Sequence, residues 1–155
     1  MANYQIITDS GSDLPEALLN QLDVRRVSLT VNFKGETLND SVDAGIKELY
    51  DGLRTGHTAT TSAVNVAQFT EAIEPHLQDG KDVLVLAFSS GLSTTYNSAV
   101  IAADDLKEKY PERKVYVVDT LCASMGQGLL VYLAAKEREQ GKSIEQVRDW
   151  AEANK

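Results

Sequence analysis

The sequence predicts an α/β domain built on a mainly parallel sheet flanked by helices. The stretch 82–88 (DVLVLAF) is almost continuously apolar, and 113–119 (RKVYVVD) has an apolar centre, as expected of strands buried on both faces of a parallel sheet. Around them, apolar residues recur three and four positions apart, which is helical spacing. Alternation of strands and helices is typical of parallel sheets with right-handed crossovers.

The N-terminal part supplies two further predicted strands. Residues 4–8 (YQIIT) form a short apolar run. A helix is expected after it, because Ser12 or Asp13 can cap a helix and Pro15 suits a first turn. Residues 24–33 (VRRVSLTVNF) alternate well enough to predict one strand.

A turn, a helix and a loop are expected next. Residues 34–36 (KGE) give a turn, and 41–56 predict a helix with Gly56 past its end. Its apolar face would be formed by Ile46, Leu49, Tyr50 and Leu53. The segment 57–65 (HTATTSAVN) is polar and is expected to be a loop.

Two amphipathic helices are predicted in the middle of the chain. The first begins at Val66, after Asn65 as its cap, and Pro75 should kink or shorten its last turn. The second spans 96–110 and is closed by Pro111.

The C-terminal part predicts two more helices. One spans about 126–139. The next begins after Ser143, and Gln146 has the spacing of a capping box. Trp150 marks an apolar face of this helix and needs a packing partner. Either the helix folds back on the domain, or the chain is the front part of something longer.

Composition limits the function classes. With 155 residues, 43% hydrophobic and 25% charged, the chain fits one soluble globular domain. The net charge is −8 and the basic residues are scattered, so nucleic acid is not an expected partner. No apolar run reaches the roughly 20 residues of a transmembrane segment. No secretory signal is visible, and a cytoplasmic location is expected. One cysteine and two histidines argue against a disulfide and a multi-histidine metal site.

Hydroxyl-rich segments cluster at the predicted carboxyl edge of the sheet, where ligands of open α/β folds usually bind. They are TDSGSD (8–13), TATTSA (58–63), SSGLSTTY (89–96) and DTLCASMGQG (119–128). Hydroxyls and the free N–H groups of a helix N-terminus can hold a phosphate or a carboxylate without Lys or Arg. One such loop alone is more often a cap, but four on one edge favour an anion site.

Enzyme motifs fit poorly. The stretch 89–96 lacks the lysine of a P-loop, and neither G-x-G-x-x-G nor G-x-S-x-G is present. A nucleophilic serine needs a base, and His57 is the only plausible one. Cys122 is interpreted as a small filler. A metal or acid–base cluster could be formed by four acids, namely Asp9, Asp13, Asp40 and Asp119. Asp13 is more simply a cap, and Asp9 and Asp119 are more simply strand-end residues that bond nearby N–H groups.

Four segments together resemble the DegV family in order and spacing. They are IITDSGSDLP (6–15), TTSAVNVAQF (60–69), FSSGLSTTYNSAVIAA (88–103) and VYVVDTLCASMGQGLLV (115–131). The resemblance implies two α/β domains that enclose a fatty acid, with no cofactor and no catalytic residues. It also implies a bacterial fatty acid kinase as partner, to which the acyl carboxylate is presented. The implied carboxylate ligands are Thr61, Ser62 and Ser93, with backbone N–H groups from Thr94 and Thr95.

The sequence departs from the family pattern at several positions. Thr94 stands where a glycine is usual, and a β-branched residue there restricts close backbone approach. Residues 63–65 (AVN) replace glutamine, proline and serine, and Thr120 replaces a serine. Family members are about twice as long, so residues 1–155 would form the N-terminal domain, with the C-terminal lipid-binding domain absent. Half a tunnel should bind an acyl chain weakly, because each enclosed CH₂ contributes about 0.8 kcal/mol.

Two other readings stay open. A small hydrolase or phosphotransferase would use Ser93 or Asp9. An interaction domain would use the hydroxyl loops as helix caps only, so that their mutation would affect stability alone.

Overall fold

A four-stranded parallel sheet forms the centre of the fold. The computed structural model describes residues 3–40 and 46–155. The sheet has the order β2-β1-β6-β7, and every neighbouring pair is parallel. Its strands are β1 (Tyr4–Asp9), β2 (Val24–Val27), β6 (Asp82–Ala87) and β7 (Val115–Asp119). The predicted α/β class with a mainly parallel sheet is confirmed.

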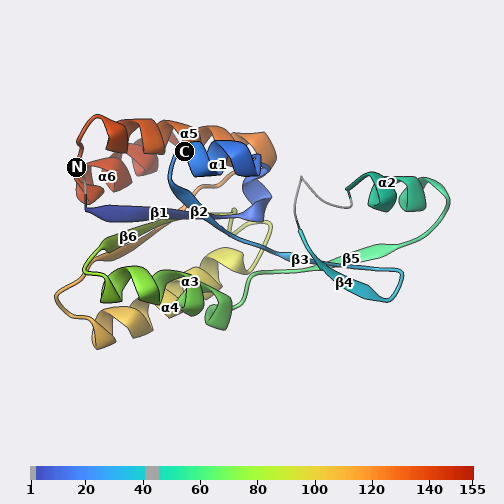
Figure 1. Ribbon diagram of the computed structural model, residues 1–155, viewed down its shortest axis with the longest axis horizontal. Helices are drawn as coiled ribbons and strands as arrows, with labels where there is room; N and C mark the ends of the chain where they lie inside the picture. Colours follow the sequence, from blue (N-terminus) through green and yellow to red (C-terminus); the bar gives the residue numbers. More distant parts are fainter. Residues whose placement is uncertain (1–2, 41–45) are drawn as a thin grey trace.

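Helices cover both faces of this sheet (Figure 1). One layer holds α1 (Glu16–Gln21), α5 (Ser124–Glu139) and α6 (Ile144–Asn154); the other holds α3 (Val66–Gln78) and α4 (Thr95–Lys109). The central strands alternate between the two cores, since Ile6 and Leu84 pack in one cluster while Ile7 and Val85 pack in the other. This burial on both faces explains the continuous apolar runs in the sequence.

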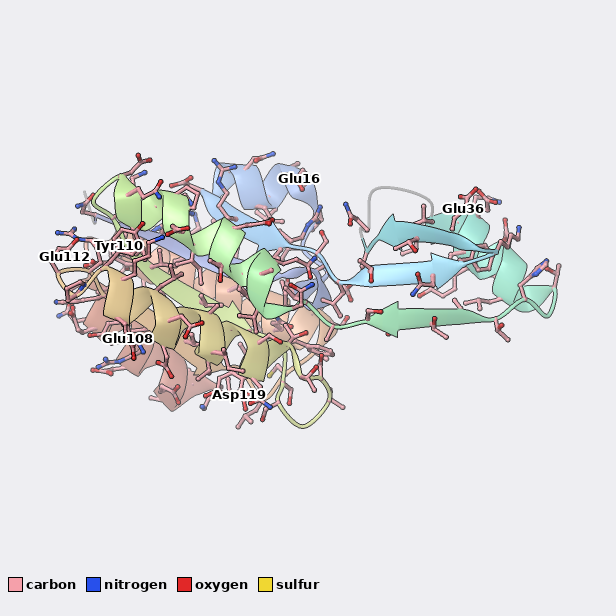
Figure 2. The ribbon with its side chains drawn as sticks, turned by 90° about the horizontal axis from the view of Figure 1, so that it is seen from below. Glu16, Glu36, Glu108, Tyr110, Glu112 and Asp119 are labelled. Carbon is pink, nitrogen blue, oxygen red and sulfur yellow. The ribbon has the colours of Figure 1, made fainter. Side chains whose placement is uncertain are left out.

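A small arm extends from this α/β body (Figures 1 and 2). It is an antiparallel sheet of order β4-β3-β5, together with helix α2 (Ile46–Arg54). Its strands are β3 (Thr30–Phe33), β4 (Glu36–Asn39) and β5 (Ala59–Ser62). Phe33 packs under α2 at Gly52, where an added Cβ would lie 2.3 Å from the ring. Glycine therefore permits this close approach.

The arm corrects two expectations. Residues 24–33 form two strands instead of one, because the chain leaves the central sheet after Val27 and enters the arm at Thr30. The expected loop 57–65 contains β5, which pairs with β3 from Ala59 to Ser62. A polar strand of this kind is stabilised by backbone pairing, which leaves no hydrophobic pattern to detect.

The predicted cap of α1 is also wrong. Residues Ser10–Ser12 form a 3₁₀ turn, η1, and Asp13 ends it in the left-handed region at φ 53°. The Ser12 hydroxyl donates to the Asp9 carbonyl at 2.9 Å. Pro15 occupies the N-cap position without a side-chain hydrogen bond, so neither Ser12 nor Asp13 caps this helix.

Two helices differ from their predicted extent or environment. Helix α3 continues through Pro75 to Gln78, since a proline in the last turn removes only one N–H bond. Residues 41–45 of the predicted 41–56 helix lie outside the described residues. On α2, three of the four residues predicted to form the apolar face are exposed, namely Ile46, Tyr50 and Leu53. This face therefore does not join the central cores.

Other helix boundaries match the sequence. Asn65 and Gln68 form a capping box on α3, and Ser143 and Gln146 form one on α6. Trp150 packs against the core cluster beneath α5 and α6, so α6 folds back on the domain. Within residues 3–40 and 46–155, no helix is long and apolar enough to cross a bilayer.

Candidate functional site

The loops after β1, β6 and β7 share the carboxyl edge of the parallel sheet, which faces the arm. Figure 2 shows Asp119, the last residue of β7, on the side of the body toward the arm, with Tyr110 and Glu112 at the opposite end. Three non-glycine residues of these loops have positive φ, namely Asp13 (53°), Leu121 (54°) and Ser124 (52°). Backbone strain of this kind collects at functional sites.

The loop between β6 and α4 satisfies nearly all its own backbone donors. Three N–H groups donate to neighbouring segments: Phe88 to Asp9 Oδ2 (2.7 Å), Ser89 to the Cys122 carbonyl (3.1 Å) and Ser90 to Asp119 Oδ1 (3.1 Å). The others donate within the loop. Gly91 N–H donates to Ser89 Oγ (3.2 Å), the N–H groups of Leu92 and Ser93 both donate to the Ser89 carbonyl (3.0 Å each), and Thr95 N–H donates to Ser93 Oγ (3.2 Å). Thr94 N–H alone in this run has no partner among the described residues. The loop thus leaves the Thr94 N–H open, and the N–H groups of Tyr96 and Asn97 in the first turn of α4 also have no partner among the described residues. The helix dipole favours an anion at this end.

The Ser93 hydroxyl lies beside this open donor and is tied to the next helical turn. Its Oγ is 2.9 Å from Thr95 Oγ1. Thr95 is fully buried, and its Oγ1 also accepts from Val64 N–H at 3.3 Å. The start of α4 is therefore bonded to the segment that follows β5.

Of the five predicted carboxylate ligands, three occupy one turn and two lie on β5. Ser93 is half-buried and Thr94 is exposed, while Thr95 uses both its N–H and its hydroxyl within the protein. Thr61 and Ser62 are exposed on β5. Among the described residues, neither hydroxyl has a hydrogen-bond partner, so both are open to a ligand.

Exposed apolar residues lie on the loop that carries Ser93 and on its neighbour. Leu92, Leu121 and Met125 are 68%, 60% and 58% exposed. The bond from Ser89 N–H to the Cys122 carbonyl places the loops that carry Leu92 and Leu121 side by side. An open polar turn next to exposed leucines suits a ligand with a charged head and an apolar tail.

Two of the four acids hold the loop from beneath. Asp9 is fully buried, and burial raises its pKa to about 6 despite hydrogen bonds from Phe88, Gln127 and Gly11. Burial acts in the same direction on Asp119, but hydrogen bonds from Ser90 and Leu121 outweigh it and lower its pKa. Both carboxylates thus accept N–H bonds at strand ends, the role that the sequence suggested as the simpler alternative.

The other two acids have separate partners. Asp13 accepts from Ser124 Oγ at 2.6 Å, and Asp40 accepts from Ser10 Oγ at 2.9 Å. In the described ranges, no three His, Cys, Asp or Glu side chains are grouped to hold a metal. His57 lies in the arm, edge-on to Phe33, and no hydrogen bond links it to Ser93 within the described part of the chain.

Sequence reasoning missed Gln127. This side chain is fully buried and its Nε2 donates to Asp9 Oδ1 at 3.1 Å and to Thr8 Oγ1 at 3.2 Å. A signal was available, because Gln127 lies on the face of α5 whose following turns bury Leu130, Val131 and Ala134. A polar residue on an apolar helix face needs a buried partner.

The fold and these loops define a class: an α/β domain with exposed hydroxyls and an open N–H group at a helix N-terminus. A family model described as an uncharacterised protein of the DegV family matches residues 3–155. A DegV domain-containing protein of Clostridium perfringens is 43% identical over 157 residues, which cover 100% of this chain and 54% of that protein. The chain belongs to the DegV family.

Solved structures share the fold. A fatty-acid-binding DegV family protein from Thermus thermophilus has 36% identity and a TM-score of 0.86, covering 97% of this chain and 52% of that one. A Thermotoga maritima protein, described as revealing a fatty acid binding function, has 32% identity and a TM-score of 0.84, covering 99% and 55%. The chain thus spans about half the length of the relatives it matches.

Proposed function

We propose that this chain binds the carboxylate head of a long-chain fatty acid at the start of α4. Thr94 N–H and the hydroxyls of Ser93, Thr61 and Ser62 would hold the two carboxylate oxygens. The observation that carries this proposal is the unpartnered Thr94 N–H beside the Ser93 hydroxyl. Fatty acid binding by the Thermus thermophilus relative supports the ligand class.

The charge of the site favours a carboxylate over a phosphate. The Thr94 N–H and three hydroxyls can stabilise a single negative charge by hydrogen bonding. Asp9 and Asp119 lie beneath the loop and the chain has a net charge of −8, which disfavours a dianion.

The apolar residues beside the proposed carboxylate site would contact the acyl tail without enclosing it. Leu92, Leu121 and Met125 offer one exposed wall. Because each enclosed CH₂ contributes about 0.8 kcal/mol, one wall should give weak affinity. The second domain implied by the family resemblance would supply the other wall.

A carrier role fits this site better than catalysis. The Ser93 hydroxyl has Thr95 as its side-chain partner, and no carboxylate or imidazole is bonded to it among the described residues. A serine nucleophile requires such a base. We therefore favour a non-catalytic module that presents the acyl carboxylate to a fatty acid kinase subunit. A partner that uses cellular ATP would place the module in the cytoplasm.

Displacement of a fluorescent fatty acid by oleate tests the head-group assignment. Ser93→Ala and Thr61→Ala should each weaken binding about tenfold, as the loss of a hydrogen bond to a charged group does. The matched controls are Ser98→Ala, one turn further along α4, and Thr60→Ala, the neighbour of Thr61 on β5. Equal affinity in all four variants would refute the head-group assignment. Submicromolar binding by the 155 residues would refute the claim that a single apolar wall gives weak affinity.

The rival readings predict other results. Turnover of an activated ester or acyl phosphate that is abolished by Ser93→Ala would establish the enzyme. If these variants lose thermal stability and nothing else, the loops are caps in an interaction domain.

A further inference from the structure

A buried polar pair, Asp9 and Gln127, lies under loop 88–94, which carries part of the proposed carboxylate site. Asp9 ends β1 and its Oδ2 accepts from Phe88 N–H, the first residue of the loop, at 2.7 Å. Its Oδ1 accepts from Gly11 N–H at 3.0 Å and from Gln127 Nε2 at 3.1 Å. Asp9 and Gln127 are both fully buried, so this contact is shielded from water.

The orientation of the Gln127 amide leaves one buried oxygen without a partner in the described part of the chain. Its Oε1 is buried and has no hydrogen-bond partner among the described residues, and it lies next to Gly11. An unsatisfied buried acceptor is unfavourable. Flipping the amide would place that oxygen against the Asp9 carboxylate. The amide is thus held in this orientation by its donation to Asp9 and Thr8.

Few residues separate Asp9 from the proposed carboxylate site. Phe88 begins the loop, and the Ser89 carbonyl then accepts from both Leu92 and Ser93 N–H. A shift at Phe88 would move Ser89, and with it the turn that positions Ser93 and leaves Thr94 N–H open. On the far side, Asp119 accepts hydrogen bonds from the N–H groups of Ser90 and Leu121.

We propose, on the basis of the fatty-acid function above, that Asp9 and Gln127 are positioning residues. They hold the loop 88–94 so that Thr94 N–H and the Ser93 hydroxyl face the bound carboxylate. An ionised Asp9 accepts all three N–H bonds. A proton on either oxygen would oppose at least one of these donors.

Ligand-free amide spectra across pH test the positioning directly. Burial raises the pKa of Asp9 to about 6, and the charge of nearby Asp40 acts in the same direction. The Phe88 and Thr94 amide signals should therefore move together with a midpoint near this value. In Gln127→Met the midpoint should rise, because the lost hydrogen bond lowers the pKa of Asp9 in the wild type. In Asp9→Asn the transition should be absent.

Octanoate affinity supplies the functional readout. Asp9→Asn should weaken binding about tenfold and Gln127→Met about threefold, because bonds to a charged group are lost. In the wild type, binding should weaken as the pH falls from about 7.5 to about 5.5, a range above the titration of an ordinary carboxylic acid. The matched control is Asp82→Asn, whose carboxylate accepts from Lys114 N–H at the opposite end of β6; its affinity should equal that of the wild type.

The failures of the two proposals differ. If the wild type binds no octanoate, the fatty-acid function fails, and the ligand-free titration still decides whether Thr94 follows Asp9. If the wild type binds but Asp9→Asn and Gln127→Met bind equally well, or if Thr94 does not follow the Asp9 titration, the positioning role is overturned. Should Asp9→Asn fail to fold, Gln127→Met decides the question.

Discussion

Val64 N–H donates to the hydroxyl of Thr95 across 3.3 Å, and the two residues are 31 positions apart. Both are fully buried. Val64 follows β5, which carries Thr61 and Ser62, and Thr95 begins α4, which follows Ser93. One buried hydroxyl thus joins the two segments that supply the proposed carboxylate ligands.

Thr95→Val should separate these segments at the cost of stability. Valine keeps the shape of threonine but leaves Val64 N–H unsatisfied, which costs about 1–3 kcal/mol for a buried donor. Urea unfolding of the variant measures this loss. Thr95→Ser retains the hydroxyl and should recover most of the stability; equal losses in both variants would show that the methyl group matters instead.

Thr94→Gly should strengthen carboxylate binding. Thr94 is exposed, makes no side-chain cap bond and has φ −75°, so its side chain contributes no hydrogen bond to the turn. Removing it opens backbone access to its N–H and should improve affinity about fivefold, equivalent to ~1 kcal/mol. Calorimetric titration with a medium-chain acid measures the change. Unchanged or weaker binding would mean that the threonine does not obstruct the ligand.

The stability contribution of Asp9 should depend on pH in an unusual direction. Its pKa is raised from 3.8 to about 6 by burial, so the folded state binds a proton more tightly than the unfolded state. Stability relative to Asp9→Asn should therefore increase by about 2 kcal/mol as the pH falls from 7 to 4. Unfolding of both proteins across this range gives the difference.

This trend opposes the expected loss of octanoate binding in acid. A purely structural Asp9 would show the same trend in stability, and its protonation would leave octanoate affinity unchanged. A flat stability difference between the two proteins would contradict the raised pKa.

Gly128→Ala should disturb the contact between α5 and η1. A Cβ at this position would lie 2.6 Å from the Ser12 carbonyl oxygen and 3.1 Å from Leu14 Cδ2. Overpacking of this kind costs about 1–3 kcal/mol. The control is Gly126→Ala, whose Cβ would meet Cys122 at 3.6 Å, an ordinary contact. Thermal unfolding should separate the two, and similar stabilities would show that α5 can shift without penalty.

Residues buried on both sheet faces were the easiest to predict from the sequence. The apolar run 82–88 identified β6, because its side chains alternate between two cores. The capping boxes at Asn65 and Ser143 fixed two helix starts through local chemistry. These features depend on neighbours in the sequence or on burial alone.

Features that depend on distant partners were missed. Strand β5 has the sequence ATTS and exists because Thr30 to Phe33 pair with it. Gln127 acquires its role from Asp9, 118 positions earlier. For the site, the hydroxyl loops could be located on one edge, but the open N–H of Thr94 depends on where every other donor of the loop is bonded.

The most direct test of the proposed carboxylate site is a titration of the isotope-labelled chain with octanoate, followed by the NMR signals of individual amides. Octanoate should shift the Thr94 signal most and should shift the signals of Thr61 and Ser62 with it, and Ser93→Ala should suppress all three shifts. Largest shifts in the hollow of the arm lined by Lys34, Ile46 and Thr55, with Thr94 unmoved, would contradict it.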